Sequence, residues 1–175
     1  MSTKGNEFKQ YIRDIPDFPQ KGIIFRDITN LLKNGPVFQQ VIDTLADEFR
    51  DQNIDLVCSV EARGFIVGAA LAQAIGAGFV PIRKKGKLPW DTHSEEYDLE
   101  YGKDEVEIHR DAVQAGQRAL FVDDLIATGG TAKASIDLIK KMHGEVVHSV
   151  FLIELSGLGG REKLSGVPVY ALMEY

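Results

Sequence analysis

Short apolar segments alternate with amphipathic stretches along most of the chain, and this alternation restricts the fold more than any other feature. Runs rich in β-branched and aromatic residues predict five strands: Leu56–Val60, Phe79–Ile82, Ala119–Val122, Val146–Ile153 and Val169–Met173. Apolar side chains at helical spacing predict three helices, over residues 36–52, 65–75 and 131–142. Short apolar strands that alternate with helices are typical of a parallel sheet covered on both faces. We therefore predict an α/β fold with a central parallel sheet flanked by helices.

Two parts of the chain depart from this alternation. The first 35 residues contain Pro16 and Pro19 and show no regular period, so we expect an irregular segment. Residues 83–97 are polar and aperiodic, whereas residues 104–109 alternate and predict an antiparallel strand. A long polar segment inside a compact domain is usually functional, often as a lid. We expect one domain, residues 1–175, with a flexible lid loop over residues 83–102.

Composition excludes several classes of function. The chain has 175 residues, 44% hydrophobic and 26% charged, as expected of one globular domain. Its formal net charge of -6 opposes the basic surface that non-specific nucleic-acid binding requires. No apolar run reaches the roughly 18 residues of a membrane span, and the first residues lack the apolar core of a secretory signal. With one cysteine there is no internal disulfide, and we expect a cytoplasmic protein that binds neither membrane nor nucleic acid.

The strongest chemical signal follows the predicted strand Ala119–Val122, in the sequence Asp123-Asp124-Leu125-Ile126-Ala127-Thr128-Gly129-Gly130-Thr131. Small residues at the start of a helix let several backbone N–H groups converge on a phosphate, and the helix dipole favours its negative charge. The two acids would repel that phosphate unless a sugar diol or a Mg²⁺ ion lay between them. The motif therefore predicts a phosphorylated sugar as ligand; a plain surface turn is the alternative.

This motif resembles the phosphoribosyl-pyrophosphate (PRPP) signature of the type I phosphoribosyltransferases, in which a strand leads to two acids and a Thr-Gly-Gly-Thr turn. Further blocks over nearly the whole chain are similar to those of the branch of this family that acts on adenine: Gly22–Thr29, Glu61–Phe65, Arg83–Pro89, Leu99–Gly102 and Gly160–Leu164. The resemblance implies the type I phosphoribosyltransferase fold, with residues 1–35 forming a small hood that carries the base-binding loop. It also implies purine salvage, in which the 5-phosphoribosyl group of PRPP is transferred to N9 of adenine, giving AMP and pyrophosphate.

The resemblance assigns roles to the residues of the phosphate motif. It places the 5-phosphate of PRPP on the backbone of Ala127, Thr128, Gly129, Gly130 and Thr131. Asp123 and Asp124 would hold the ribose hydroxyls, directly or through Mg²⁺ and its waters. Because Mg²⁺ keeps several waters and takes ligands from substrate phosphates, we expect it to bind near these two acids without a dedicated set of protein ligands.

Cationic residues at two other strand ends suit a pyrophosphate leaving group. Arg63 lies between a predicted strand and a predicted helix, and one fixed donor on a leaving group typically contributes about 10²–10³ in rate. Arg83, Lys84, Lys85 and Lys87 place four positive charges in five residues, which suits a polyphosphate; a solvated basic face is the alternative. In the family, the arginine at the position of Arg83 reaches the pyrophosphate of the neighbouring subunit, so the resemblance implies a homodimer.

The base site and the proton-handling group depend on the resemblance. It assigns adenine to Ile24, Phe25 and Arg26, with the Phe25 ring stacked on the base; an ordinary apolar core is the alternative from the residues alone. It assigns Glu100, in the lid, to N7 or N9 of adenine, where a carboxylate can manage a proton. From the sequence alone Glu100 is one of several acids in a polar segment.

Two other functions stay open at this point. One is a phosphoribosyltransferase that acts on an oxopurine, although the blocks Gly22–Thr29 and Leu99–Gly102 weigh against it. The other is a PRPP-binding regulator. A regulator would need a helix-turn-helix domain or a basic face, for which this short acidic chain offers no room.

Overall fold

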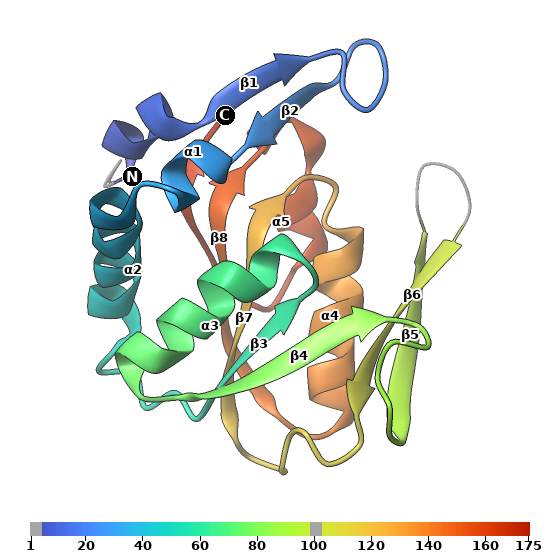
Figure 1. The fold of residues 1–175 in the computed structure, drawn as a ribbon. Helices are drawn as coiled ribbons and strands as arrows, with labels where there is room; N and C mark the ends of the chain where they lie inside the picture. Colours follow the sequence, from blue (N-terminus) through green and yellow to red (C-terminus); the bar gives the residue numbers. More distant parts are fainter. Residues whose placement is uncertain (1–4, 99–102) are drawn as a thin grey trace.

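The computed structural model describes residues 5–98 and 103–175, and their central element is a seven-stranded sheet (Figure 1). The strands lie in the order β5-β6-β4-β3-β7-β8-β9. Neighbouring strands are parallel from β4 to β9: β4 (Gly78–Lys84), β3 (Leu56–Val60), β7 (Arg118–Ile126), β8 (Glu145–Glu154) and β9 (Val169–Glu174). β6 (Lys103–His109) is antiparallel to β4, and β5 (Thr92–Asp98) is antiparallel to β6. The sheet is therefore mixed, whereas the sequence predicts a parallel one with a single antiparallel strand.

Helices cover both faces of the sheet because its inner strands carry apolar side chains on both sides. α2 (Gly35–Phe49) and α3 (Arg63–Ile75) pack on one face, and α4 (Gly130–Lys141) packs on the other (Figure 1). Along β7, Leu120 belongs to the first of these two cores and Phe121 to the second, and both are fully buried. The three helices and five strands predicted from apolar spacing are confirmed to within a few residues at each end. No helix in the described parts of the chain has the length and apolar character needed to cross a membrane.

The N-terminal segment is more regular than the sequence predicts. Short helices η1 (Asn6–Tyr11) and α1 (Thr29–Leu32) flank a hairpin of β1 (Arg13–Pro16) and β2 (Ile24–Asp27), which lies above the sheet in Figure 1. The two strands pair only with each other and leave most of their side chains partly or fully exposed. They therefore lack the buried apolar face that periodicity detects, and the expectation of an irregular segment was wrong.

The segment after β4 also differs from the predicted aperiodic loop. Thr92–Asp98 forms β5, which pairs with β6 along its whole length. β5 is the outermost strand of the sheet and is rich in polar residues, so its sequence shows no apolar alternation. The antiparallel strand predicted over residues 104–109 is confirmed as β6. Residues 99–102, the end of the predicted lid, lie outside the described residues.

The carboxyl ends of β3, β4 and β7 come together at one edge of the sheet, on the side of the hairpin β1–β2 (Figure 1). β3 ends at Val60, whereas β7 continues beside β8 as far as Ile126. The last residues of β7 therefore extend beyond the end of β3, on the side of the turn that follows β3. Open α/β sheets bind ligands at this edge.

Two short helices, η2 (Ser156–Leu158) and α5 (Gly160–Lys163), lie between β8 and β9 in the chain.

Candidate active site

Asp123 and Asp124 lie within β7, whereas the sequence predicts that the strand ends before them, at Val122. The strand continues because β8 pairs with it past this point, with Asp123 opposite Phe151. The backbone N–H of Asp124 donates to Oδ1 of Asp123 at 2.8 Å. Burial raises the pKa of both carboxyls; the charge of Asp124 raises the pKa of Asp123 further, while Arg63 opposes the rise at Asp124. Two enclosed carboxyls of this kind are suited to accept sugar hydroxyls or to bind a cation.

The residues between β7 and α4 form a cavity of about 120 Å³, the size of a small anion site. All five residues to which the resemblance assigns the 5-phosphate line it, and we call residues 127–131 the phosphate loop. Gly129 precedes α4 with a φ of 76°, in the left-handed region that favours glycine. A Cβ at Gly129 would lie 2.6 Å from the carbonyl oxygen of Gly160, and a Cβ at Gly160 would lie 2.3 Å from that of Ala127. The phosphate loop is therefore packed backbone to backbone against the start of α5.

Arg63 is the first residue of α3 and connects three parts of the site. Its Nη2 lies 2.7 Å from Oδ2 of Asp124. The guanidinium also lies over the Phe25 ring, 4.8 Å from its centre, and Nη1 donates to the carbonyl oxygen of Arg26 at 3.5 Å. One cationic side chain thus connects the acids of β7 with the hairpin β1–β2.

Gly64, the residue after Arg63, has no room for a side chain. A Cβ at this position would lie 2.6 Å from Oδ1 of Asp123 and 3.0 Å from the hydroxyl oxygen of Ser59. Ser59 is itself fixed, because its buried hydroxyl donates to the carbonyl oxygen of Val122 at 2.7 Å. The N-terminus of α3 can approach the carboxylates of β7 this closely only with glycine at Gly64.

A larger cavity, of about 340 Å³, adjoins the phosphate loop. Asp123 and Thr131 line both cavities, so the two cavities adjoin each other, and together we call them the cleft. The charged side chains that line the larger part come from three strands (β4, β6 and β7), the turn after β3 and the start of α3: Glu61, Arg63, Lys84, Asp104, Asp123 and Asp124. The sites predicted at three separate strand ends are thus brought together.

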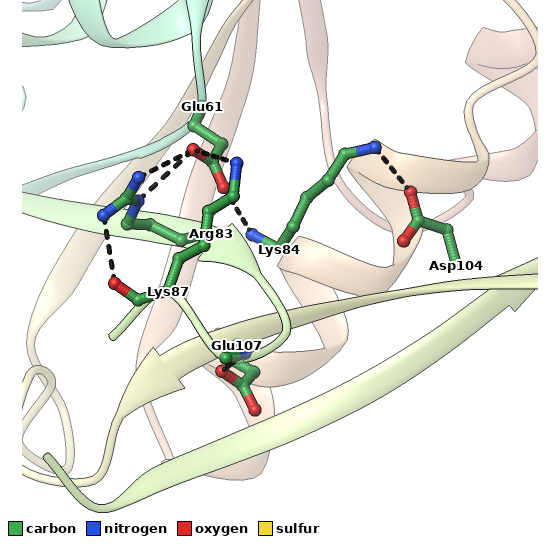
Figure 2. A network of polar contacts seen from close by, with 7 residues as sticks. Glu61, Arg83, Lys84, Lys87, Asp104 and Glu107 are labelled. Atoms are coloured by element: carbon green, nitrogen blue, oxygen red, sulfur yellow. Dashed lines mark hydrogen bonds and ion pairs between the residues drawn. The ribbon is translucent and has the colours of Figure 1, made fainter. Parts of the chain in front are cut away.

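The basic segment, residues 83–87, is balanced by carboxylates of the same chain (Figure 2). Arg83 and Lys87 bind Glu61 at 3.0 and 3.3 Å, and Lys84 binds Asp104 at 2.8 Å. The remaining contacts are those of Lys85 with Glu105 at 2.7 Å and of the Gly86 N–H with Glu107 at 2.8 Å. From its sequence the segment is a concentration of positive charge, but in the folded chain each of its cations already has an anionic partner.

The predicted base-binding residues Ile24, Phe25 and Arg26 lie on β2, where Arg63 contacts the ring of Phe25 and the carbonyl oxygen of Arg26. Ile24 is exposed, and Phe25 is partly buried against the edge of Phe18. The Arg26 guanidinium instead stacks on the Tyr175 ring, 4.1 Å from its centre. The Phe25 ring and the carbonyl oxygen of Arg26 thus contact Arg63, which lines the cleft, whereas the Arg26 side chain lies against Tyr175.

Glu100, the predicted proton-handling residue, lies outside the described residues. The structure adds two residues to which no role was assigned from the sequence. Tyr97, on β5, lines the cleft and donates its hydroxyl to Asp104 at 3.1 Å. Glu61 stands in a block that marks the family, but its pairing with the basic segment depends on contacts between distant parts of the chain.

The acids of β7 fit a magnesium ion that is bound mainly by substrate and water. In residues 5–98 and 103–175, no group of three or more His, Cys, Asp or Glu residues could hold a metal ion. Oδ2 of Asp124 is buried and accepts no well-aligned hydrogen bond, although Arg63 lies close by. This atom and its neighbour Asp123 supply the hard oxygen donors that Mg²⁺ prefers.

The chain resembles known proteins over almost its whole length. The family model described as a phosphoribosyl transferase domain matches residues 27–167, which include the phosphate loop, the acids of β7, Arg63 and the basic segment. The chain therefore belongs to the phosphoribosyltransferase family, whose fold the described residues share. Within this family it belongs with the adenine phosphoribosyltransferases, on the strength of the following relatives.

The adenine phosphoribosyltransferase of Halothermothrix orenii is 56% identical over 168 residues, which cover 96% of this chain and 99% of that protein. A crystal structure of the enzyme from Thermoanaerobacter pseudethanolicus is 51% identical and superposes with a TM-score of 0.94, covering 97% of this chain and 98% of that one. The Saccharomyces cerevisiae enzyme, crystallised with adenine and an imino-altritol bisphosphate, is 39% identical with a TM-score of 0.92, covering 98% and 99%. The fold and the enzyme class predicted from the sequence blocks are confirmed.

Proposed function

We propose that this chain transfers the 5-phosphoribosyl group of PRPP to N9 of adenine, releasing AMP and pyrophosphate. The observation that carries the proposal is that the phosphate loop, the acids of β7 and Arg63 line two adjoining cavities, with Arg63 paired to Asp124. Arg63 in turn contacts the ring of Phe25, to which we assign the base. The order of these groups along the cleft matches the order of phosphate, ribose and base in the product.

The phosphate loop binds the 5-phosphate through the N–H groups that open α4, with the Thr128 and Thr131 hydroxyls as further donors. Asp123 and Asp124 accept hydrogen bonds from the ribose hydroxyls. When bound, Mg²⁺ neutralises charge on the pyrophosphate and is held near these two acids. The ribose is thereby fixed by groups that are positioned before it binds, which lowers the entropic cost of reaching the reactive geometry.

Arg63 and Lys84 stabilise the pyrophosphate as it leaves. The bond between ribose C1 and the pyrophosphate oxygen lengthens, C1 becomes cation-like, and negative charge grows on the leaving group. Arg63 and Lys84 line the cleft from the start of α3 and the end of β4. They pair with Asp124 and Asp104 there, and the growing negative charge of the leaving group attracts both cations. Arg83 and Lys87 belong to the same basic segment and are further pyrophosphate ligands of this proposal, Arg83 for the pyrophosphate of the neighbouring subunit.

Phe25 stacks on adenine, and backbone groups of Ile24 and Arg26 read the edge of the base. A paired donor and acceptor distinguish a 6-amino purine from a 6-oxo purine, because the wrong base would leave buried groups unpaired. We assign Glu100 to the proton of the imidazole ring of adenine on the basis of its sequence block alone. Both assignments follow the family resemblance, and the exposed position of Ile24 on β2 supports the first.

We also propose that the enzyme is a cytoplasmic homodimer. Ile66 on α3 and Phe79 on β4 are large apolar side chains that are 44% and 36% exposed, which favours a protein contact over solvent. Light scattering coupled to size-exclusion chromatography measures the mass in solution, and a mass near that of one chain would contradict the dimer.

A panel of purine bases tests the proposed reaction. The purified protein is given PRPP and Mg²⁺ with adenine, hypoxanthine, guanine or xanthine, and the nucleotides are separated by chromatography. We expect AMP from adenine alone and no product after chelation of Mg²⁺. Turnover of an oxopurine would retain the PRPP site but contradict the assignment of the base site, and PRPP binding without turnover of any base would favour the regulator.

A further inference from the structure

The helix α5 has no role in the proposed function, yet its first residue contacts the phosphate loop. Gly160 is buried, and a Cβ there would lie 2.3 Å from the carbonyl oxygen of Ala127. In the opposite direction, a Cβ at Gly129 would lie 2.6 Å from the carbonyl oxygen of Gly160 and 3.1 Å from its Cα. The two backbones therefore meet at two points of the loop, and a displacement of Gly160 would displace the phosphate loop with it.

α5 does not hold this position by itself, because it has only four residues. A helix of one turn is unstable in water without tertiary contacts, so contacts with the rest of the chain decide where Gly160 lies. Two side chains of this segment supply such contacts. Leu164, which follows α5, is buried in the core on the α4 side of the sheet, and Arg161 makes polar contacts with the ends of two strands.

Arg161 binds the last residue of β8 and the first residue of β9. Its Nε donates to Oε1 of Glu154 at 2.9 Å, and its Nη2 donates to Oε2 of the same carboxylate. Its Nη1 donates to the carbonyl oxygen of Val169 at 2.7 Å. A guanidinium that binds a carboxylate through two parallel N–H groups has a fixed orientation, and only 8% of the Glu154 side chain is exposed. Arg161 thus fixes α5 to both strands.

Arg161 and Glu154 act from outside the cleft. Among the described residues, neither belongs to the lining of its two cavities, and both instead line a separate cavity of about 490 Å³. Their influence on the loop therefore passes through the backbone of α5. We propose that Arg161 is a positioning residue for the phosphate loop, which holds Gly160 in place through its contacts with Glu154 and Val169. This inference rests on the proposed function, in which the loop binds the 5-phosphate of PRPP.

Arg161→Gln tests the proposal, because glutamine has a single amide nitrogen and cannot replace all three contacts of the guanidinium. Isothermal titration measures the affinity for ribose 5-phosphate, which probes the phosphate loop, and separately for magnesium pyrophosphate, which probes the other end of the cleft. We expect the affinity for ribose 5-phosphate to fall at least about tenfold, since small misplacements in a site have large effects. The affinity for magnesium pyrophosphate should stay within about twofold, because distant sites behave independently. KM for PRPP should rise in parallel, while kcat changes less.

Glu154→Gln separates positioning from a long-range effect of charge. It makes the opposite change in net charge, so electrostatic attraction alone would strengthen phosphate binding. Loss of positioning weakens it, because the guanidinium has lost the carboxylate that orients it. We expect both single variants to weaken ribose 5-phosphate binding, and the variant with both substitutions to lose no more than the larger single loss, since the two groups act as a pair. Tighter binding in Glu154→Gln, or additive losses, would overturn the proposal.

Arg118→Gln is the matched control for the loss of an arginine. Arg118 binds Glu145 at 2.7 Å and the carbonyl oxygen of Gln52 at 3.3 Å, a set of contacts like that of Arg161. It is the first residue of β7, whereas the phosphate loop follows the last one. We expect its affinity for ribose 5-phosphate to stay within about twofold of the parent. An equal loss in this control, or equal losses of ribose 5-phosphate and pyrophosphate affinity in Arg161→Gln, would contradict a specific effect on the loop.

A measurement on the unsubstituted protein covers the case in which the variants do not fold. Hydrogen exchange followed by mass spectrometry reports the opening of the backbone in residues 127–131 and 160–164. Because coupling between two sites is reciprocal, we expect ribose 5-phosphate to slow exchange in both segments. Unchanged exchange in residues 160–164 at saturation would refute the coupling. Formation of AMP from adenine and PRPP in the same preparation tests the proposed function separately from this inference.

Discussion

Gly64→Ala changes the active site by one methyl group at the point where α3 approaches β7. The new Cβ would lie 2.6 Å from Oδ1 of Asp123, 3.0 Å from the Ser59 hydroxyl and 3.3 Å from Cα of Asp123. The Asp123 carboxylate can rotate away from the methyl group, but it then gives up the hydrogen bond from the Asp124 N–H. The backbone contact remains whatever the carboxylate does, so the start of α3 must also move.

The magnitudes follow from these two responses. Overpacking of this kind costs about 1–3 kcal/mol of unfolding free energy. In a chain of this size that corresponds to a fall in Tm of roughly 2–12 °C. Displacement of Asp123 and of Arg63, which begins the same helix, is expected to lower kcat/KM for PRPP by about 10²-fold, since small misplacements in a site have effects of that size.

The assays are steady-state kinetics with PRPP as the varied substrate and thermal unfolding followed by circular dichroism. Gly35→Ala is the matched control, because Gly35 begins α2 with open space within 4 Å of a Cβ and no positive φ. We expect the control to keep the parent activity and to lose no stability. Parent kinetics in Gly64→Ala would refute the argument that this glycine sets the geometry of the carboxylates.

Three further predictions concern charge in and near the cleft. Arg63→Ala removes the partner of Asp124 and the proposed donor to the leaving group, so kcat should fall by about 10²–10³ while circular dichroism shows the fold retained; near-normal turnover would contradict the assignment. Asp123→Asn removes a charge whose burial raises the carboxyl pKa, so Tm should rise by about 2–4 °C while activity falls by orders of magnitude, and a lower Tm would contradict this account. Burial lowers the pKa of His148, so its contribution to stability is fully present above about pH 6.5 and is lost as the pH falls through that value toward the lower pKa of the folded state. His148→Leu should flatten the dependence of Tm on pH between about 7.5 and 5.5 in thermal melts, and an unchanged slope would show that other groups govern it.

Local patterns predicted much of the fold and the phosphate loop. The inner strands are apolar on both faces, and the sequence from Asp123 to Thr131 carries its acids, glycines and threonines in one continuous stretch. The hairpin β1–β2 and the edge strand β5 were missed, because strands that pair at an edge or only with each other need no buried apolar face.

Ion pairs between residues far apart in the sequence could not be predicted, for a different reason. Glu61 and Arg83 are brought together because β3 and β4 are parallel neighbours, so their carboxyl ends lie side by side. The burial of Asp123 likewise depends on contacts between distant parts of the chain: β7 extends beyond β3, and Gly64 lies close to the Asp123 carboxylate. Positive charge in residues 83–87 is visible in the sequence, but its neutralisation by carboxylates from other strands is visible only in the folded chain.

A crystal structure of the protein with magnesium PRPP and a non-reacting adenine analogue tests the central claim most directly. We expect the 5-phosphate on the phosphate loop, the ribose hydroxyls at Asp123 and Asp124, and the base against Phe25. The pyrophosphate group should lie beside Arg63 and Lys84. A phosphate bound away from residues 127–131, or a base that does not contact Phe25, would contradict the account of this cleft.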